Sequence, residues 1–282
     1  MFFIPDRFLE ELLEEDLPLD DLTSRALNLE NTPGQVKAAA REEQVAANVE
    51  AAARLFALAG AQTEIAAPSG RLVQPGELIL TAKGPAGGLH AVYKTAQNIL
   101  EYSGGIASRC ALLKSLAGRV NPRAEILVTR KHFPGTKRLS LSAALAGGAS
   151  IHRTGLSDSI LIFDQHREFT GGCQGLAELL PAAVHRYPEK LIAAEAATPQ
   201  EAEFLARAGA GIIQCEKFSP QDLAAAVPRL RAINPQIRIV AAGGINSTTV
   251  SALAASGADG LVTSWPYYAK PLDVSMRFER LN

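Results

Sequence analysis

The sequence predicts an α/β protein in two parts, an N-terminal α+β domain followed by an incomplete, irregular α/β barrel. Its 282 residues allow one large barrel or two domains, because single hydrophobic cores stop growing at roughly 250 residues. The first 115 or so residues mix helical patterns with short strands, which is an α+β arrangement. From about residue 124 the pattern changes, and short apolar runs alternate with helical stretches. Such runs are typical of parallel strands buried on both faces.

The elements of the N-terminal part follow from apolar spacing and turn residues. Residues 5–30 contain an acidic amphipathic stretch with apolar side chains at helical spacing. After it, Asp20, Asp21 and Thr23 indicate a turn or a helix start. The further predicted elements are, in order, a short strand within 35–42, an Ala-rich helix over 45–60, two short strands around Pro75-Gly76 within 71–81 and a long helix over 88–117.

The second part shows six apolar runs, namely EILVTR, SILIF, KLIAAEA, AGIIQCE, IRIVAAGG and DGLVTS. Helical spacing over 199–209 and 220–233 separates some of them, which indicates a parallel barrel or a doubly wound sheet. Six strands over about 150 residues are too few for a full eight-unit barrel, so a shortened or irregular barrel is favoured. In such barrels the active site lies in the loops at the carboxyl ends of the strands.

Charge and cysteine content exclude several classes of protein. With 28 Lys and Arg against 29 Asp and Glu, the net charge is -1. A nearly neutral chain is neither a broadly basic nucleic-acid binder nor an electrostatic membrane-surface protein. Three dispersed cysteines without a CxxC spacing favour buried free thiols over disulfides or zinc. No apolar run approaches the roughly 20 residues that span a bilayer, and the acidic N-terminus is unlike a signal peptide. We expect a cytoplasmic protein that binds no membrane.

The first polar cluster follows the run EILV. Five side chains that can carry positive charge lie within nine residues here, at Arg130, Lys131, His132, Lys137 and Arg138. Arg presents a planar fork to carboxylate or phosphate and Lys a point charge, so the cluster predicts a local anion site. The alternative is a solvated basic loop. His152 and Arg153 form a further pair that could face the same anion.

Carboxylates follow the next three runs. Asp164 and His166 would point the same way on an extended chain, and could bind metal or exchange protons; alternatively, Asp164 caps a turn above a packed His166. Glu195 and Glu216 end two successive runs. Because acids beside apolar strands are costly unless paired or functional, the two could bracket a sugar, bind its hydroxyls and oppose an oxocarbenium-like charge. Alternatively, they form ordinary salt bridges, with Lys217 as partner of Glu216.

A pair of glycines ends the fifth run. Gly243 and Gly244 would let backbone N–H groups approach a phosphate, and late barrel loops frequently hold phosphate. The alternative is a tight strand–helix turn. Ser264 ends the next run, so it would neighbour this loop and could donate its hydroxyl.

Read in order, these segments resemble the quinolinate phosphoribosyltransferase family of NAD biosynthesis. The similarity covers nearly the whole chain and is carried by EDLPLDDLTS, QNILEYSGGIASR, TRKHFPGTKR, HRTGLSDSILIFDQH, GIIQCEKFSP and AAGGI. The resemblance implies an N-terminal domain over 1–115, joined by the C-terminal segment 270–282, and a barrel of the type II phosphoribosyltransferase kind over 116–269. It also implies a homodimer in which the partner's N-terminal domain completes each site.

The resemblance further implies transfer of phosphoribose from phosphoribosyl pyrophosphate to a ring nitrogen, with Mg²⁺ neutralising the pyrophosphate. By position, the substrate-binding residues are Arg130, Lys131, His152 and Arg153, and the residues that bind phosphate are Lys137, Arg138, Gly243, Gly244 and Ser264. Glu195 matches the ribose-binding glutamate, and Glu216 stands where the family has an aspartate. Glu195, Glu216 and Lys131 are thus the expected catalytic residues, with both glutamates able to hold Mg²⁺ through water.

The departures from the family pattern concern the acceptor. Tyr102 replaces the family's carboxylate-binding arginine, and Phe163 replaces a lysine. Loss of two cations should weaken binding of a pyridine dicarboxylate by orders of magnitude, and aromatic rings would favour a flatter, less charged heteroaromatic acceptor. This altered set resembles the ModD proteins, relatives described as pyrophosphorylases and associated with molybdenum transport. Two alternatives remain, a non-catalytic oxyanion- or nucleotide-binding relative and a genuine quinolinate enzyme.

Overall fold

The computed structural model describes residues 2–282, which form two compact units. Unit 1 comprises the residues up to Ala111 together with His132–Gly148 and Pro266–Asn282. Unit 2 comprises Leu112–Lys131 and Ala149–Trp265. The antiparallel strands lie in unit 1 and the parallel sheet lies in unit 2.

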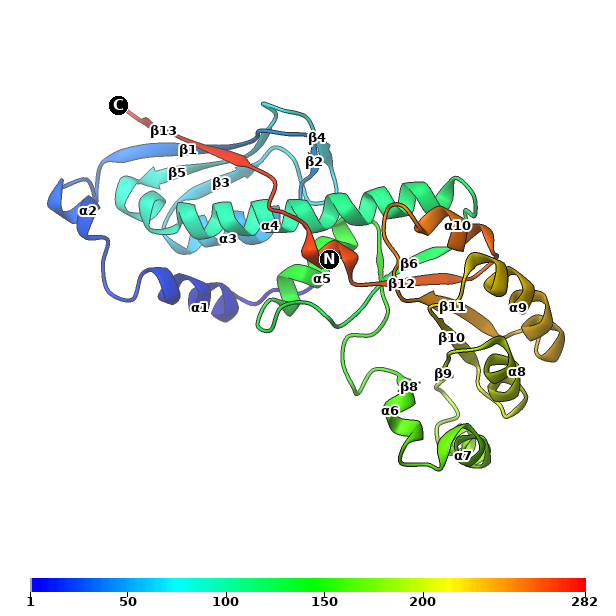
Figure 1. The fold of residues 1–282 in the computed structure, drawn as a ribbon. Coiled ribbons are helices and arrows are strands. Elements are labelled where there is room, and N and C mark those ends of the chain that lie inside the picture. The colour runs from blue at the N-terminus through cyan, green and yellow to red at the C-terminus, as the bar shows by residue number, and fades with distance from the viewer. Residues whose placement is uncertain (1) are drawn as a thin grey trace. The chain divides into compact units, whose positions relative to one another are not determined.

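Unit 1 is built on a four-stranded antiparallel sheet in the order β13-β1-β5-β3 (Figure 1). These strands are β1 (Pro33–Ala40), β3 (Gln62–Ile65), β5 (Leu78–Pro85) and β13 (Val274–Arg280), and a second, two-stranded sheet pairs β2 (Gln44–Val45) with β4 (Leu72–Val73). Side chains of β1 alternate between buried and partly exposed positions, as expected of a sheet with one face on a core. Because β13 pairs along β1, the C-terminal segment belongs to the N-terminal sheet.

The helices of unit 1 are α1 (Asp6–Asp16), α2 (Leu22–Ala26), α3 (Val49–Leu58), the first part of α4 (Ala86–Gly118) and α5 (Lys137–Ala146). Apolar side chains of α3 and α4 join those of β1 and β5 in one buried core. The Asp21 carboxylate accepts the backbone N–H groups of Thr23 and Ser24, which satisfies free donors of the first turn of α2. The predicted helix start at this point is therefore confirmed.

Unit 2 contains seven parallel strands in the order β7-β6-β12-β11-β10-β9-β8. They are β6 (Glu125–Val128), β7 (Ser150–Ile151), β8 (Ile160–Ile162), β9 (Ile192–Ala196), β10 (Ile212–Glu216), β11 (Arg238–Ala242) and β12 (Gly260–Thr263). This order follows the chain around a barrel and is broken between β7 and β8, which form the two edges. The predicted incomplete barrel is confirmed. The sequence analysis missed β7 because two residues are too short for a periodic signal.

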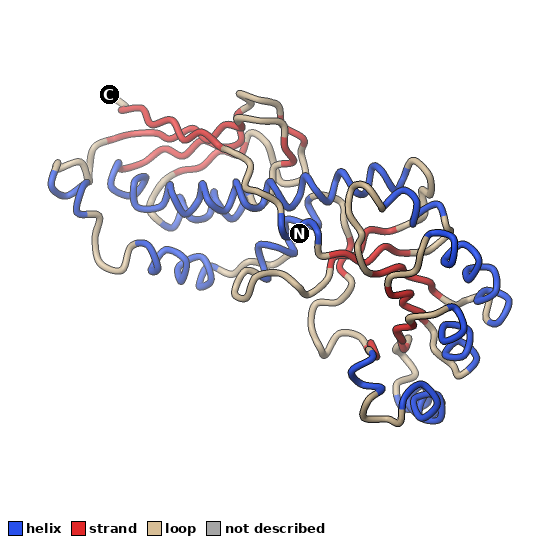
Figure 2. The backbone as a smooth tube through the Cα atoms, viewed as in Figure 1, coloured by secondary structure: helices blue, strands red, loops and turns tan. Residues whose placement is uncertain are grey.

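Helices of unit 2 cover one side of the parallel strands, as the tube in Figure 2 shows. They are α6 (Asp164–Arg167), α7 (Gly172–Arg186), α8 (Pro199–Arg207), α9 (Pro220–Ile233) and α10 (Val250–Ala255). The 3₁₀ turn Trp265–Tyr268 leads from unit 2 into the last segment of unit 1. Thr198 and Ser219 cap α8 and α9, and a proline follows each cap. These signals explain why the two helices start where the sequence predicts.

Helix α4 carries glycines where another part of the backbone approaches it closely. A Cβ atom built at Gly105 would lie 2.3 Å from the carbonyl oxygen of Lys270, in the segment that leads to β13. A Cβ atom at Gly118, in the same helix, would meet nothing within 4 Å. The absence of a side chain at Gly105 therefore allows the C-terminal segment to cross α4.

We expect Gly105→Ala to lower the free energy of unfolding by about 1–3 kcal/mol, because the added methyl group overpacks this crossing. Gly118→Ala is the matched control, and it should be neutral or stabilising by up to about 1 kcal/mol, since alanine favours helix. Denaturant unfolding followed by circular dichroism measures both. Equal effects at the two positions would show that the crossing does not constrain Gly105.

Candidate active site

Two carboxylates lie at the carboxyl edge of the parallel sheet in unit 2. Glu195 is the fourth residue of β9, and Glu216 is the last residue of β10, the neighbouring strand. The parallel register sets Glu195 opposite Gln214, whose Nε2 donates a hydrogen bond of 2.9 Å to Glu195 Oε2. Gln214 itself is buried. Glu195 is therefore held by an amide and not by a cation.

Burial raises the pKa of Glu195 above its ordinary value, and the neighbouring charge of Glu216 raises it further. The hydrogen bond from Gln214 acts in the opposite direction. Lys217, the partner suggested by the sequence, forms no ion pair with Glu216 within residues 2–282. Its backbone has a left-handed φ of 55°, and its N–H donates to the Ala242 carbonyl at 2.7 Å. The salt-bridge alternative does not describe these two glutamates.

The glycine pair after β11 forms a tight loop against β10. Gly243 and Gly244 have φ values of 89° and 69°, which favour glycine. A Cβ atom at Gly243 would lie 2.6 Å from Lys217 Cγ and 2.9 Å from Glu216 Oε1. The Thr263 hydroxyl of β12 donates to the Ile245 carbonyl at 2.8 Å, which fixes the loop to the strand that Ser264 follows. The glycines, Glu216 and Ser264 thus end three neighbouring strands, as the sequence predicts.

Four basic side chains follow β6 and β7. Arg130 and Lys131 come after β6, whereas His152 and Arg153 come after β7, where the His152 N–H donates to the Val128 carbonyl at 3.0 Å. Burial lowers the pKa of His152 to about 4, with a smaller effect from Arg153, so the imidazole is neutral at pH 7. Arg153 is only 6% exposed, and its pKa is lowered by burial and then by repulsion from Arg130. It forms no ion pair within the described chain.

Phe163 follows β8 and contacts two basic residues. The guanidinium carbon of Arg153 lies 5.4 Å from its ring centroid, and the His166 ring stacks on it at 6.0 Å. The backbone N–H of Phe163 donates to His166 Nδ1 at 3.0 Å, while Asp164 pairs with Arg167 at 2.7 Å. The expectation that Asp164 and His166 act together on an extended chain is wrong, because α6 starts here and gives each side chain a local partner.

Three of the predicted site residues belong to unit 1. Tyr102 lies on α4, and Lys137 and Arg138 begin α5. The guanidinium of Arg138 donates to the Phe3 carbonyl at 2.9 Å. Arg130 and Lys131 belong to unit 2, whereas Lys137 and Arg138 begin a helix of unit 1, so the basic run is not one continuous loop.

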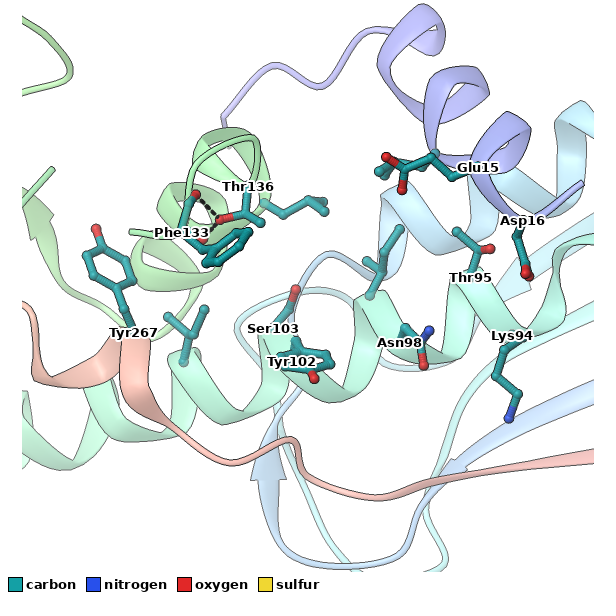
Figure 3. Close-up of a pocket in the computed structure, with 15 residues that line it drawn as sticks. Glu15, Asp16, Lys94, Thr95, Asn98, Tyr102, Ser103, Phe133, Thr136 and Tyr267 are labelled. Carbon is teal, nitrogen blue, oxygen red and sulfur yellow. Dashed lines mark hydrogen bonds between the residues drawn. The ribbon is translucent and has the colours of Figure 1, made fainter. Parts of the chain in front are cut away.

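Tyr102 is 60% exposed and lines a cavity of about 780 Å³ within unit 1. Figure 3 shows Glu15 and Asp16 of α1 on one side and Phe133, before α5, on another. The cavity contains no arginine. Its lysine, Lys94, donates to Gln97 at 2.8 Å and lies 5.2 Å from the Tyr93 ring centroid. The cavity that Tyr102 lines is thus mostly apolar and uncharged, with two acids and one lysine. The other lining residues are Leu12, Thr95, Asn98, Ile99, Ser103, Ile106, Thr136, Leu139, Ser140 and Tyr267.

Two residues that act on Glu195 were not predicted, Gln214 through a hydrogen bond and Arg167 through its charge. Gln214 lies two positions before Glu216, so both side chains are on one face of β10; this alternation was a usable signal. Arg167 is buried and pairs with Asp164 at 2.7 Å and with Glu201 at 3.1 Å, which joins α6 to the first turn of α8. Nothing in the local pattern around Arg167 indicates that it would be buried.

The three cysteines are free thiols, as predicted, but only two of them are buried. Cys110 and Cys215 are buried, and burial raises the pKa of each thiol to about 12. Cys173 is half-buried, which the sequence did not predict. All three are free thiols.

Glu195, Glu216 and Gln214 offer side-chain oxygen atoms, which are the ligands that a hard cation such as Mg²⁺ prefers. Within residues 2–282, no group of three or more His, Cys, Asp or Glu side chains is arranged to hold a metal. However, Mg²⁺ commonly binds one or two carboxylates and takes its other ligands from water and substrate phosphates. Glu195 and Glu216 repel each other, and Gln214 Oε1 is buried without a hydrogen-bond partner. This donor set fits Mg²⁺ that is bound together with a phosphorylated substrate.

Residues 21–103 match the quinolinate phosphoribosyl transferase N-terminal domain, and residues 106–277 match the C-terminal domain of the same family. A relative in Rhodobacter capsulatus, named "Putative pyrophosphorylase ModD", is 41% identical over 91% of this chain and 98% of its own. A protein of the same name in Pasteurella multocida is 33% identical over 99% of both chains. The crystal structure of NadC from Streptococcus pyogenes superposes with a TM-score of 0.88, at 27% identity, over 98% of this chain and 97% of its own.

An antiparallel-sheet unit, an incomplete parallel barrel and carboxylates at its carboxyl edge define an enzyme of the pentosyltransferase class. The chain belongs to the quinolinate phosphoribosyl transferase family, whose members are phosphoribosyltransferases, and its relatives include the ModD proteins. No helix among residues 2–282 combines the length and apolar character that a membrane crossing requires.

The raised pKa of Glu195 leads to a stability prediction. A carboxyl whose pKa is higher in the folded than in the unfolded chain destabilises the fold when ionised, and this penalty disappears as the pH falls below the unfolded value. At pH 7 we therefore expect Glu195→Gln to have a Tm equal to or above that of the wild type, since Gln214 can donate to the new amide oxygen. The difference should shrink by pH 4. A large loss of Tm at pH 7, measured by calorimetry, would contradict this assignment.

Proposed function

We propose that the protein transfers the phosphoribosyl group of phosphoribosyl pyrophosphate to a heteroaromatic acceptor other than quinolinate, in a Mg²⁺-dependent reaction that releases pyrophosphate. The observation that carries this proposal is the meeting of Glu195 and Glu216 with the Gly243-Gly244 loop at one edge of the barrel. This edge combines negative charge for a developing sugar cation with exposed backbone for a phosphate.

In this proposal the two glutamates act on the ribose. Glu195 accepts hydrogen bonds from ribose hydroxyls, and the charges of Glu195 and Glu216 stabilise the oxocarbenium-like transition state. Gln214 keeps the Glu195 carboxylate in place through its hydrogen bond of 2.9 Å. The same glutamates would hold Mg²⁺ through water, and its charge would neutralise the pyrophosphate that leaves.

The cations and the glycine loop hold the anionic parts of the substrates. Lys131 and Arg130 would bind phosphate groups of the donor, with Lys137, Arg138 and Ser264 as further phosphate-binding residues. The backbone N–H groups of Gly243 and Gly244 would approach the 5′-phosphate. His152 and Arg153 would face the acceptor, with a neutral imidazole at pH 7. Low exposure of Arg153 strengthens its attraction for an anion because water screens it little.

The preference against quinolinate rests on two replaced cations. Phe163 contacts Arg153 where the family has a lysine, and Tyr102, where the family has an arginine, lines a cavity that Glu15 and Asp16 also line. A dicarboxylate therefore lacks two of its expected partners. A genuine quinolinate enzyme would need compensating cations, and the cavity around Tyr102 offers only Lys94, which is bound to Gln97.

We also propose a cytoplasmic homodimer in which the partner's N-terminal domain completes each site, and a role linked to molybdenum uptake. Support for both comes from the resemblance to the quinolinate phosphoribosyltransferase and ModD proteins. Light scattering of the purified protein tests the dimer.

Donor binding is the first test. We expect calorimetric titration with phosphoribosyl pyrophosphate to give a micromolar Kd that strengthens when Mg²⁺ is present, because the metal offsets the charge between substrate and glutamates. Glu195→Gln should lose this binding and all turnover while remaining folded. Absence of binding with and without Mg²⁺ would overturn the proposed reaction in favour of an oxyanion- or nucleotide-binding protein, and molybdate would be the next ligand to titrate.

Acceptor preference is tested by restoring the family's cations. We expect Tyr102→Arg combined with Phe163→Lys to raise kcat/KM for quinolinate by roughly tenfold to hundredfold per restored cation, because each adds a charged hydrogen bond to a carboxylate. Pyrophosphate release measures the rate. The matched control is Tyr102→Gln with Phe163→Leu, which removes the rings without adding charge. Efficient quinolinate turnover by the wild type, with little gain in the variant, would instead identify a quinolinate enzyme.

A further inference from the structure

The open side of the barrel is spanned by a contact between Arg153 and Phe163. Strands β7 and β8 are the two edges of the sheet and do not pair with each other. Arg153 lies two residues after the end of β7, and Phe163 directly follows β8. The distance of 5.4 Å from the guanidinium carbon to the ring centroid is within the range of a cation–π interaction. The two edges are therefore linked by side chains where no backbone ladder joins them.

Arg153 is a buried cation whose neighbours leave it without a carboxylate. Arg130 repels it, and Asp158 attracts it without forming an ion pair. The Asp158 carboxylate instead accepts the backbone N–H of Thr154 at 2.8 Å and its hydroxyl at 3.2 Å. Burying an unpaired charge is costly, and the electron-rich face of Phe163 offsets part of that cost.

The other basic residues beside this contact have different roles. His152 is neutral at pH 7, and His166 Nδ1 accepts the Phe163 N–H at 3.0 Å. Arg130, which repels Arg153, is assigned to the donor phosphates in the proposed function. Among the three residues His152, Arg153 and Phe163, only Arg153 can pair with an anion. Its planar fork suits one carboxylate, with two parallel hydrogen bonds.

We propose that Phe163 is a positioning residue that holds the Arg153 guanidinium at the open edge of the barrel, and that the acceptor is a heteroaromatic ring with one carboxylate. This proposal rests on the proposed function and specifies its acceptor. Phe163 then acts on the acceptor through Arg153, whereas the sequence analysis expected its ring to stack on the acceptor directly.

The contact itself is tested without any ligand by a double-mutant cycle. Phe163→Leu should lower the Tm of the wild type by more than it lowers the Tm of Arg153→Met, because the cation that the ring attracts is absent from the second background. Phe163→Tyr keeps an aromatic face, so it should retain the wild-type Tm. An equal loss in both backgrounds would overturn the positioning role.

The acceptor class is tested with pyridine-3-carboxylate and pyridine-2,3-dicarboxylate as probes in calorimetry, with phosphoribosyl pyrophosphate titrated separately. We expect the wild type to bind the monocarboxylate at least tenfold more tightly than the dicarboxylate. Phe163→Leu should lose at least tenfold in monocarboxylate affinity, and Phe163→Tyr should restore it. Equal or tighter binding of the dicarboxylate, or binding of neither acid, would overturn the acceptor class. Failure of the wild type to bind phosphoribosyl pyrophosphate would instead overturn the proposed function.

Discussion

The parallel pairing of β9, β10 and β11 is the constraint on which the candidate site depends. Parallel strands end at the same edge, so residues far apart in sequence meet there. Glu195, Glu216 and Gly243 come from three consecutive strands, and a Cβ atom at Gly243 would lie 2.9 Å from Glu216 Oε1. The glycine is therefore needed both for its left-handed backbone and for the space that the neighbouring glutamate occupies. A shift in the pairing of any one strand would separate the three.

Two pairs of like charges lie along this edge, one acidic and one basic, and burial strengthens the repulsion within each pair. Glu195 has a raised pKa because it is half-buried and near Glu216, and Arg153 is buried near Arg130. The two charges of each pair repel each other. In the proposed reaction, anionic phosphates of the donor would offset the repulsion between Arg153 and Arg130, and a sugar that becomes cationic would offset the repulsion between the glutamates.

Much of the fold was predictable because its signals are local. Capping side chains before α8 and α9, the turn at Pro75-Gly76 and the apolar strand runs each depend on neighbouring residues. The elements that escaped prediction have weak local signals. Strand β7 has two residues, and β13 is defined by its long-range pairing with β1. Similarly, the hydrogen bond from Gln214 to Glu195 joins two neighbouring strands, so it depends on how the strands pair.

By itself, the sequence determined the fold class, the family and the residue types at the carboxyl edge, because these follow from periodicity and ordered motifs. Only the tertiary structure decided how those residues are used. It assigned His166 to the backbone of Phe163 and Asp164 to Arg167, and it left Glu216 without the predicted partner Lys217. It also set the Phe163 ring against Arg153. Such choices depend on distances between segments that the chain brings together only when it folds.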